Sequence, residues 1–254
     1  MTTLRLAWGG PPEAIAKGLA PQDDPRDHPA LLVSYYYWKN FVKQRARYGF
    51  RDYILDSGAF SAMNSGKAID LVEYTERAGE LLRTDPQCTE VVALDVVGDW
   101  KQSRRNLEWM WSRGVPATPC FHIGAPWHEL QALVKQYPKV NVGELVPLAR
   151  KPKTLARVLD TVFAHTWKAA GGPYPLHGLG CVSEKVLMGW PFDSVDASSW
   201  ELGPCAYGRW QVYGDMSVRG GSQDLRAEVE WYLRLERRAQ HRWRKVLKQA
   251  RERQ

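Results

Sequence analysis

Short apolar runs alternate with longer helical patterns along most of the chain. An alternation of strands and helices is typical of a parallel α/β protein. Eight parallel strands are the number that closes a TIM-type (β/α)8 barrel, which is the fold we expect. The runs predicted to be strands are residues 30–35, 52–56, 90–95, 117–122, 139–144, 175–180, 192–196 and 206–212.

Amphipathic patterns predict helices between these strands. In residues 70–83, Leu71, Tyr74, Ala78 and Leu81 recur at helical spacing, and Pro126 suits the start of a helix over 127–137. A long helix is expected over 223–253, and its second half loses its apolar face, so we expect that half to extend into solvent. The other predicted helices are 101–113, 154–169 and 183–188.

A doubly wound open sheet is the rival architecture. The chain has no glycine-rich phosphate loop of the GxGxxG or GxxxxGK[ST] kind, which disfavours that rival. A length of 254 residues is enough for one domain with a full core. We therefore expect a single barrel domain over residues 1–221, followed by a basic C-terminal helix over 222–254.

The chain is basic, with a formal net charge of +7 and a pI of about 9.2. Residues 222–254 hold ten Lys and Arg against five acids, so this segment carries most of the excess. A basic patch favours a polyanionic partner, and we expect Arg242, Arg244 and Lys248 to contact a nucleic-acid backbone. The alternative is a solvated basic helix end with no partner.

Two further features of composition limit the class of protein. No apolar run is long enough to cross a bilayer, and no signal peptide is evident, so we expect a soluble cytoplasmic protein. The four cysteines lie far apart with no CxxC pair, which indicates reduced thiols rather than a zinc site or disulfides. We therefore predict no metal and no cofactor.

Polar residues end five of the predicted strands: Asp56, Asp95, His122, Glu144 and Asp196. The carboxyl ends of barrel strands converge on one mouth, so these side chains are expected to share a site. Each could instead cap a helix, and Asp95 has the strongest claim to that alternative. Residues three apart on a strand face opposite ways, so we assign chemistry to Asp196 and a structural role to Asp193.

Small and aromatic residues beside these strand ends are further candidates. We expect Gly58, Gly143 and Gly178 to let a ligand approach the backbone, and Ser57 and His177 to contact it. Among 12 tryptophans, most are expected in the core. Trp200, which follows Asp196, is the one favoured to stack on a base.

The motifs taken together resemble the tRNA-guanine transglycosylase superfamily, and most of all its short DNA-acting, phage-associated members. The segment Asp56-Ser57-Gly58-Ala59-Phe60 departs from the family's DSGGF signature only at Ala59. Residues 177–196 match its glycine-rich strand, short helix and Asp-ended strand, and residues 93–96 look like its third-strand acid. The resemblance covers residues 31–210.

This resemblance implies a (β/α)8 barrel that attacks the N-glycosidic carbon of a nucleotide whose base is flipped from the stack. Asp196 would be the nucleophile, Asp56 the general acid or base, and Asp95 a base-reading residue. The family's Cys/His zinc site has no counterpart here. His122-Ile123-Gly124 and Gly143-Glu144-Leu145 replace the family's Gln-Gly and Gly-Gly-Leu, which favours a base other than plain guanine.

Several functions remain open on the sequence. The first is a DNA glycosylase that excises a modified base, in a phage–host conflict by analogy with the relatives. The second is a transglycosylase that inserts a 7-deazaguanine. An inert DNA-binding barrel and a small-molecule nucleosidase are the rivals from other classes. Glu144 could also pair with Arg150 or Lys151 and never meet substrate.

Overall fold

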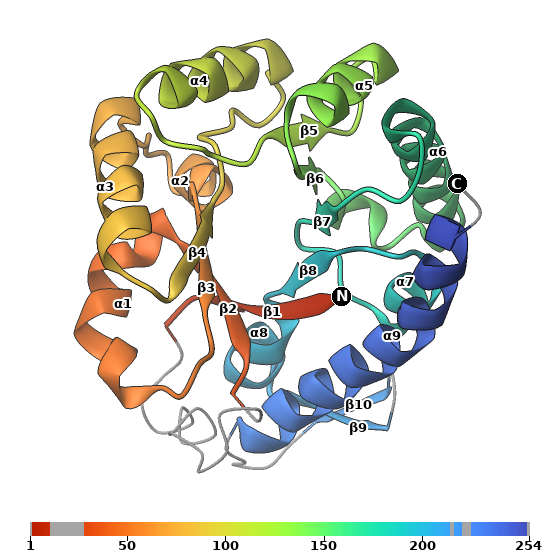
Figure 1. Cartoon of the computed structure of the whole chain (residues 1–254). Helices are drawn as coiled ribbons and strands as arrows, with labels where there is room; N and C mark the ends of the chain where they lie inside the picture. The colour runs from red at the N-terminus through yellow and green to blue at the C-terminus, as the bar shows by residue number, and fades with distance from the viewer. Residues whose placement is uncertain (1, 11–27, 214–215, 220–224, 253–254) are drawn as a thin grey trace.

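The computed structural model describes residues 2–10, 28–213, 216–219 and 225–252. Eight parallel strands form one sheet that curls into a ring with the helices outside it (Figure 1). The strand order is β4-β3-β2-β1-β8-β7-β6-β5. This is the expected α/β barrel architecture, although the ladder is open between β4 and β5. The strands are β1 Thr3–Trp8, β2 Ala30–Ser34, β3 Tyr53–Asp56, β4 Cys88–Val91, β5 Cys120–His122, β6 Val140–Gly143, β7 Leu176–Gly178 and β8 Ser194–Ala197.

The open seam is narrow. A single parallel bridge joins Val92, just after β4, to Thr118, just before β5. The Thr118 amide donates to the Val91 carbonyl at 2.8 Å, and the Ala93 amide donates to the Thr118 carbonyl at 2.9 Å. The two ends of the sheet therefore meet at one point of the ring.

The barrel has the expected number of strands, but one of the eight predicted strands is wrong. The ring contains β1, which pairs with β2 and β8 and was not predicted. Residues 206–212 do not join the ring. Helix α8 (Ser199–Tyr207) is followed by β9 (Arg209–Tyr213), which pairs antiparallel with β10 (Met216–Arg219). Strand β1 was not predicted because Arg5 lies in the middle of it, at an inward position that an apolar side chain usually occupies.

The predicted helices are confirmed within a few residues, and three short helices were missed. Asp70 caps α3 by accepting from the Glu73 amide at 2.8 Å, and Asp99 caps α4 by accepting from the Gln102 amide at 2.9 Å. Asp95 is therefore not the cap of α4. The predicted helices are α3 Leu71–Thr84, α4 Trp100–Ser112, α5 Trp127–Gln136, α6 Pro152–Ala170, α7 Glu184–Gly189 and α9 Arg226–Glu252; the missed ones are α1 Trp38–Gln44, α2 Ala59–Asn64 and α8.

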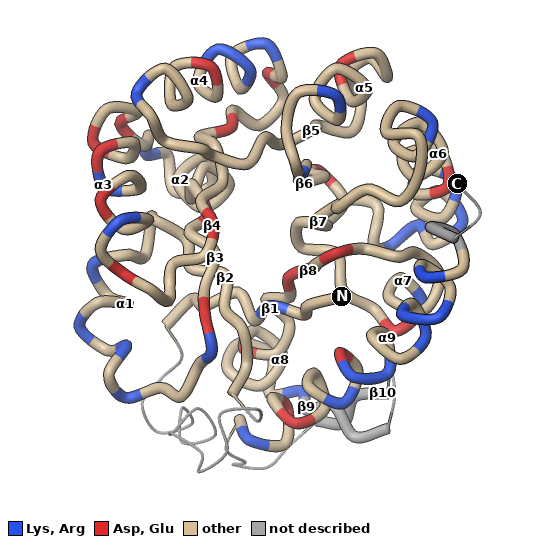
Figure 2. Tube along the Cα trace, viewed as in Figure 1, with Lys and Arg blue, Asp and Glu red and all other residues tan. Residues whose placement is uncertain are grey.

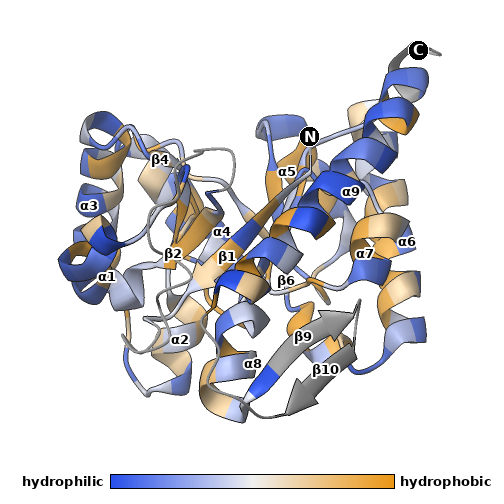
Figure 3. Ribbon diagram, turned by 90° about the horizontal axis from the view of Figure 1, so that it is seen from below, coloured by the Kyte–Doolittle hydropathy of each residue, from blue (hydrophilic) through white to orange (hydrophobic). Residues whose placement is uncertain are grey.

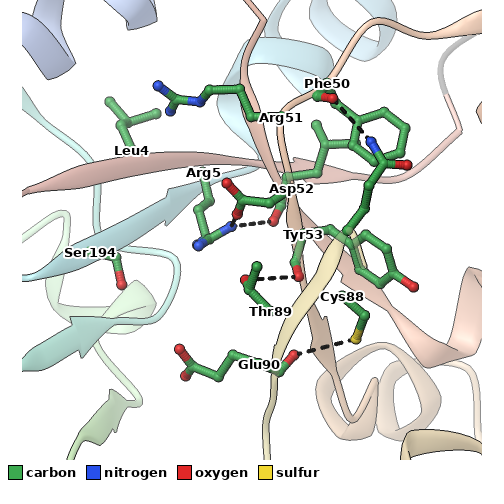
Figure 4. A network of polar contacts seen from close by, with 12 residues as sticks. Leu4, Arg5, Phe50, Arg51, Asp52, Tyr53, Cys88, Thr89, Glu90 and Ser194 are labelled. Atoms are coloured by element: carbon green, nitrogen blue, oxygen red, sulfur yellow. Dashed lines mark hydrogen bonds and ion pairs between the residues drawn. The ribbon is translucent and has the colours of Figure 1, made fainter. Parts of the chain in front are cut away.

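The apolar core lies between the strands and the helices, whereas the inside of the ring is polar. On β1, Leu4, Leu6 and Trp8 belong to the core, while Arg5 lies on the other face of the strand. Arg5 Nη1 donates to Asp52 Oδ1 at 2.6 Å (Figure 4). Lys139 Nζ donates to Glu90 Oε2 at 2.8 Å. Buried charges are costly unless they are paired, so the interior depends on these ion pairs.

Helix α9 packs along the outside of the ring against β1, α7 and α8 (Figure 1). Glu236 is almost fully buried and accepts from the Leu4 amide at 3.2 Å and from Arg51 Nη2 at 2.9 Å. The helix stays packed as far as Trp243, whose Nε1 donates to the Leu187 carbonyl at 2.6 Å, and its last turns are mainly exposed. The expected extension into solvent is thus confined to the last turns. In the described residues, no helix combines the length and the apolar character needed to cross a membrane.

We predict that Glu236→Ala destabilises the protein by about 3 kcal/mol, because it leaves the Leu4 amide and the Arg51 guanidinium without their buried acceptor. The measurement is urea unfolding at equilibrium. The matched control on the same helix is Glu230→Ala. Glu230 lies 3.6 Å from Arg234 in an exposed pair, so its removal should cost no more than about 0.5 kcal/mol. Equal costs for the two variants would contradict a role of α9 in holding β1.

Candidate active site

Three carboxyl groups come together at the carboxyl end of the ring. Asp56 ends β3, Asp95 follows β4, and Asp196 lies in β8. The charges of Asp95 and Asp196 both raise the pKa of Asp56, which requires each of them to lie within electrostatic reach of Asp56. Figure 2 shows acidic positions along the strands of the ring, β8 among them. The structure therefore brings together the two acids singled out in the sequence.

Asp56 is held in a tight turn and carries a proton near neutral pH. Burial, together with the charges of Asp95 and Asp196, raises its pKa to about 7. Its Oδ2 accepts from the Gly58 amide at 2.9 Å. Gly58 has φ +79°, and a Cβ there would lie 2.7 Å from the Tyr36 amide nitrogen, so only glycine fits. A carboxyl group with a pKa near the working pH suits a general acid.

Asp196 is buried and anchored through one oxygen. The Gly180 amide donates to Asp196 Oδ1 at 2.7 Å, and His177 Nε2 lies 3.3 Å from the same oxygen. A backbone N–H directed at a carboxylate stabilises its negative charge. Asp193 precedes β8 and lies 3.4 Å from Lys139 Nζ, at the other end of the strand. The two acids of this segment are thus placed as the alternation along the strand predicts.

Asp95 accepts a hydrogen bond from Ser57, the residue that follows Asp56 in the chain. Ser57 is fully buried, and its Oγ donates to Asp95 Oδ1 at 2.8 Å. Burial raises the pKa of Asp95, although His122 and the Ser57 hydroxyl oppose that rise. Ser57 thus links the turn after β3 to the acid after β4.

His122 and Glu144 form a pair across the ends of β5 and β6. His122 Nδ1 lies 3.3 Å from Glu144 Oε1, and its Nε2 lies 3.1 Å from Ser103 Oγ. Glu144 Oε1 also accepts from the Gly98 amide at 3.2 Å. The alternative ion pair with Arg150 or Lys151 does not form in the described part of the chain.

The backbone at Glu144 is strained. This residue has φ +62°, in the left-handed region that residues other than glycine seldom adopt. Such strain is concentrated at functional sites, where the surrounding structure maintains it. It places a carboxylate at the mouth, beside His122, in a conformation that costs about 1 kcal/mol or more.

Two of the predicted ligand-facing glycines serve packing. A Cβ on Gly143 would lie 2.9 Å from Cys120 Sγ, and one on Gly178 would lie 3.1 Å from the Phe192 ring. Both glycines therefore have a role in packing against the protein's own side chains, and their contact with a ligand stays a prediction. The missing signal was the identity of the side chain opposite each glycine, which depends on strand register.

The prediction that Trp200 stacks on a base is wrong. Trp200 has no exposed surface, and its Nε1 donates to the Ala7 carbonyl at 2.9 Å, so it closes the core beneath α8. His177 is likewise fully buried. It touches Asp196 from inside the ring and does not face a substrate.

The three α9 cations lie at the opposite end of the molecule from the acids. Gln240, just before Arg242, donates to the carbonyl of Thr2, which precedes β1. The last turns of α9, with Arg244 and Lys248, extend beyond the ring at the end opposite α2 and α8 (Figure 3). These side chains therefore lie away from the mouth that holds Asp196, and their predicted contact with a nucleic-acid backbone would have to be made apart from it.

Sequence reasoning missed a group of exposed apolar side chains around the mouth. They follow β3, β6 and β8 within a few residues of Asp56, Glu144 and Asp196. Their signal in the sequence is an apolar side chain in the short helix or turn that follows a strand, at a position that is normally polar. The group consists of Phe60, Met63, Val146, Leu202 and Tyr207, each at least 44% exposed.

One cluster in the site has the donor types of a transition-metal centre. Ligand atoms of Asp95, Cys120 and His122 lie within 4.8 Å of one another, beside a cavity of about 10 Å³. Tetrahedral zinc ligands lie ~3.5 Å apart, given bonds of about 2.0–2.3 Å. Both His122 nitrogens are already engaged by Ser103 and Glu144. In this arrangement His122 is engaged in hydrogen bonds and offers no free nitrogen to a metal ion.

No family model matches the chain, and no curated protein sequence matches it.

We predict that Asp56→Asn stabilises the protein at pH 8, and that the gain is about 2 to 3 kcal/mol smaller at pH 5. The folded pKa of about 7 lies above the ordinary value of about 3.9, so wild-type stability falls as the pH rises between these values. Asparagine keeps an acceptor for the Gly58 amide and carries no charge. The gain at pH 8 should be about 2 to 4 kcal/mol in urea unfolding.

The control is Asp70→Asn, which replaces one good helix cap by another at an exposed position. Its effect should be small and equal at both pH values. A loss of stability in Asp56→Asn that is the same at pH 5 and pH 8 would show that Asp56 is ionised throughout this range.

Proposed function

We propose that this protein cleaves the N-glycosidic bond of a modified base in DNA, with Asp196 acting on the sugar and Asp56 on the departing base. One observation carries the proposal: two carboxyl groups share one mouth in different surroundings. The pKa of Asp56 is raised to about 7, while Asp196 Oδ1 accepts a backbone N–H. A pair of carboxyl groups at one sugar can serve as the acid and the nucleophile of glycosidic cleavage.

The chemistry follows from these two carboxyl groups. Breaking the bond to the base develops positive oxocarbenium charge on the sugar, which the Asp196 carboxylate stabilises or traps. The base leaves with the electron pair of the bond and takes the proton of Asp56. Water then completes an excision and leaves an abasic sugar. A free base that enters instead gives an exchange, which is the alternative function.

The neighbouring polar groups favour a base rich in hydrogen-bond donors. Asp95 and Glu144 offer carboxylate oxygens, and His122 links Glu144 to Ser103. Carboxylates accept from exocyclic amino groups or sugar hydroxyls. The resemblance to the tRNA-guanine transglycosylase superfamily supports the same reaction class, and the changes at His122 and Glu144 support a base other than guanine.

The surroundings of the mouth suit a nucleic acid better than a free nucleoside. Phe60 and Tyr207 are 56% and 65% exposed there, and exposed aromatic or apolar side chains can stack on bases or wedge between them. Lys67, Lys151 and Lys153 are exposed on the segments that follow β3 and β6. The same side chains could serve an inert DNA-binding barrel, which retention of both acids disfavours.

The direct test is to incubate the protein with plain DNA and with phage DNA that carries modified bases. Free base is measured by mass spectrometry, and abasic sites by alkali cleavage on gels. We predict that Asp196→Asn lowers turnover about 1,000-fold or more, because it removes the charge that stabilises the sugar cation, while DNA affinity changes less than about threefold.

Asp193→Asn is the matched control, since Asp193 precedes the same strand and faces Lys139 away from the mouth. It should keep turnover within about threefold of the wild type. Full activity of Asp196→Asn would exclude Asp196 as the nucleophile. Base release that depends on an added free base would favour exchange over excision, and binding without either activity would favour the inert binder.

A second prediction concerns the DNA-binding face. Replacing Lys151 and Lys153 by alanine should lower the salt dependence of DNA binding by about 0.9 in log–log slope for each phosphate that these lysines neutralise. Replacing Arg242, Arg244 and Lys248 by alanine should leave that slope unchanged, because they lie at the other end of the ring. The reverse pattern would place the DNA on α9 and remove the mouth from the binding face.

A further inference from the structure

A chain of hydrogen-bonding side chains runs through the inside of the ring to Asp196. It begins at Lys139, just before β6, whose Nζ donates to Glu90 Oε2 at 2.8 Å and to Ser194 Oγ at 3.0 Å. Ser194 Oγ lies 2.8 Å from His177 Nδ1. His177 Nε2 lies 3.3 Å from Asp196 Oδ1. Residues of β4, β7 and β8 and the residue just before β6 thus contribute to one connected path.

The direction of each hydrogen bond follows from the donors present. An ammonium group only donates, so Lys139 occupies a lone pair of Ser194 Oγ. The Ser194 side chain is buried, and its own O–H then has His177 Nδ1 as its acceptor. Nδ1 is therefore the unprotonated nitrogen of a neutral imidazole, and the ring proton is on Nε2.

The other end of the imidazole is directed at the nucleophile. His177 Nε2 is fully buried and makes no hydrogen bond of good geometry with another described residue. The polar atom that lies near it is Asp196 Oδ1, at 3.3 Å. Hydrogen bonds of this kind are often long without substrate and tighten in the reacting complex. The Gly180 amide and His177 both address Oδ1. In the described part of the chain no donor reaches Oδ2, which leaves that oxygen for the sugar.

We propose that Lys139, Ser194 and His177 are positioning residues that fix the imidazole tautomer, so that its Nε2–H contacts Asp196 Oδ1 and orients Oδ2 toward the substrate. This deepens the proposed function and rests on it for the role of Asp196. The tautomer and the contact stand on the geometry alone. Groups that orient a reacting side chain in this way typically change rates by 10- to 100-fold when they are removed.

The charges around the imidazole agree with a neutral ring. Burial lowers the pKa of His177, and Lys139 lowers it further, while Asp196 and Glu90 oppose the change. These groups lie on β4, β6 and β8, the elements packed around His177 inside the ring. Asp196 itself faces His177, Asp56 and the Cys181 thiol.

The experiment that needs no substrate is imidazole NMR of protein labelled with ¹⁵N-histidine. The chain has six histidines, and a His177→Gln variant identifies the signals of His177. We expect a neutral ring protonated on Nε2 at pH 7 and above, because burial lowers the pKa of His177. Ser194→Ala should lose this tautomer preference, and Ser194→Thr, which keeps the hydroxyl, should retain it. A ring protonated on Nδ1, or an imidazolium at pH 7, would overturn the proposal whatever the protein's activity.

The activity arm uses the base-release assay. Ser194→Ala should lower kcat about 10-fold or more and leave KM nearly unchanged, because the orientation of Asp196 acts in the reacting complex. Ser194→Thr, which keeps the hydroxyl, should restore kcat. His165→Gln is the matched control: it is a half-buried histidine stacked on Trp127 in the helical layer, and it should change neither kcat nor KM. An unchanged kcat in Ser194→Ala would overturn the positioning role.

The experiments distinguish failure of the proposed function from failure of the hydrogen-bonded chain. If wild-type protein releases no base from any DNA while His177 shows the expected tautomer and its dependence on Ser194, the proposed function fails and the hydrogen-bonded chain stands. If base is released but the tautomer is wrong, the function stands and the chain fails.

Discussion

The structure depends on the pairing of charges inside a ring of strands. Most barrels of this kind fill their interior with branched apolar side chains. Here the interior holds Arg5 paired with Asp52 and Lys139 paired with Glu90, and the apolar core lies between the strands and the helices. Buried ions contribute little net stability but make the loss of one partner costly. The interior therefore favours one arrangement of side chains over any loosely packed alternative.

The cost of burying unpaired charges also applies to the mouth at the carboxyl end of the ring. Three carboxyl groups within electrostatic reach cannot all be ionised cheaply, so the ring must supply donors or retain protons. It does both: Gly180 donates to Asp196, Ser57 donates to Asp95, and Asp56 keeps its proton near neutral pH. The contrast between Asp56 and Asp196 is thus a product of their surroundings. Their residue type alone does not create it.

The sequence predicted the fold class, seven ring strands and the meeting of Asp56 with Asp196, because parallel strands end at a common edge and acids there are visible in the pattern. It missed β1, because a buried Arg5 looks like an interruption of a strand until its partner Asp52 is known. It misplaced Trp200 and His177, since nearness to Asp196 in the chain does not tell whether a side chain points into the core or toward the mouth. The location of the α9 cations depended on the packing of Glu236 and Gln240 against β1 and its flank, which no local pattern encodes.

The place of β1 in the ring has a consequence for how the molecule is made. Thr3 pairs with Ser194, and Leu4 binds Glu236 of α9. During synthesis from the amino end, β1 is made long before β8 and α9. The partner of one of its edges lies about 190 residues further along the chain, and the partner of its outer apolar face about 230 residues further. Contacts this distant are slow to form, and an unpaired strand edge is prone to association with other chains. Until β8 and α9 have been made, β1 therefore keeps an unpaired edge that neither of its later partners covers.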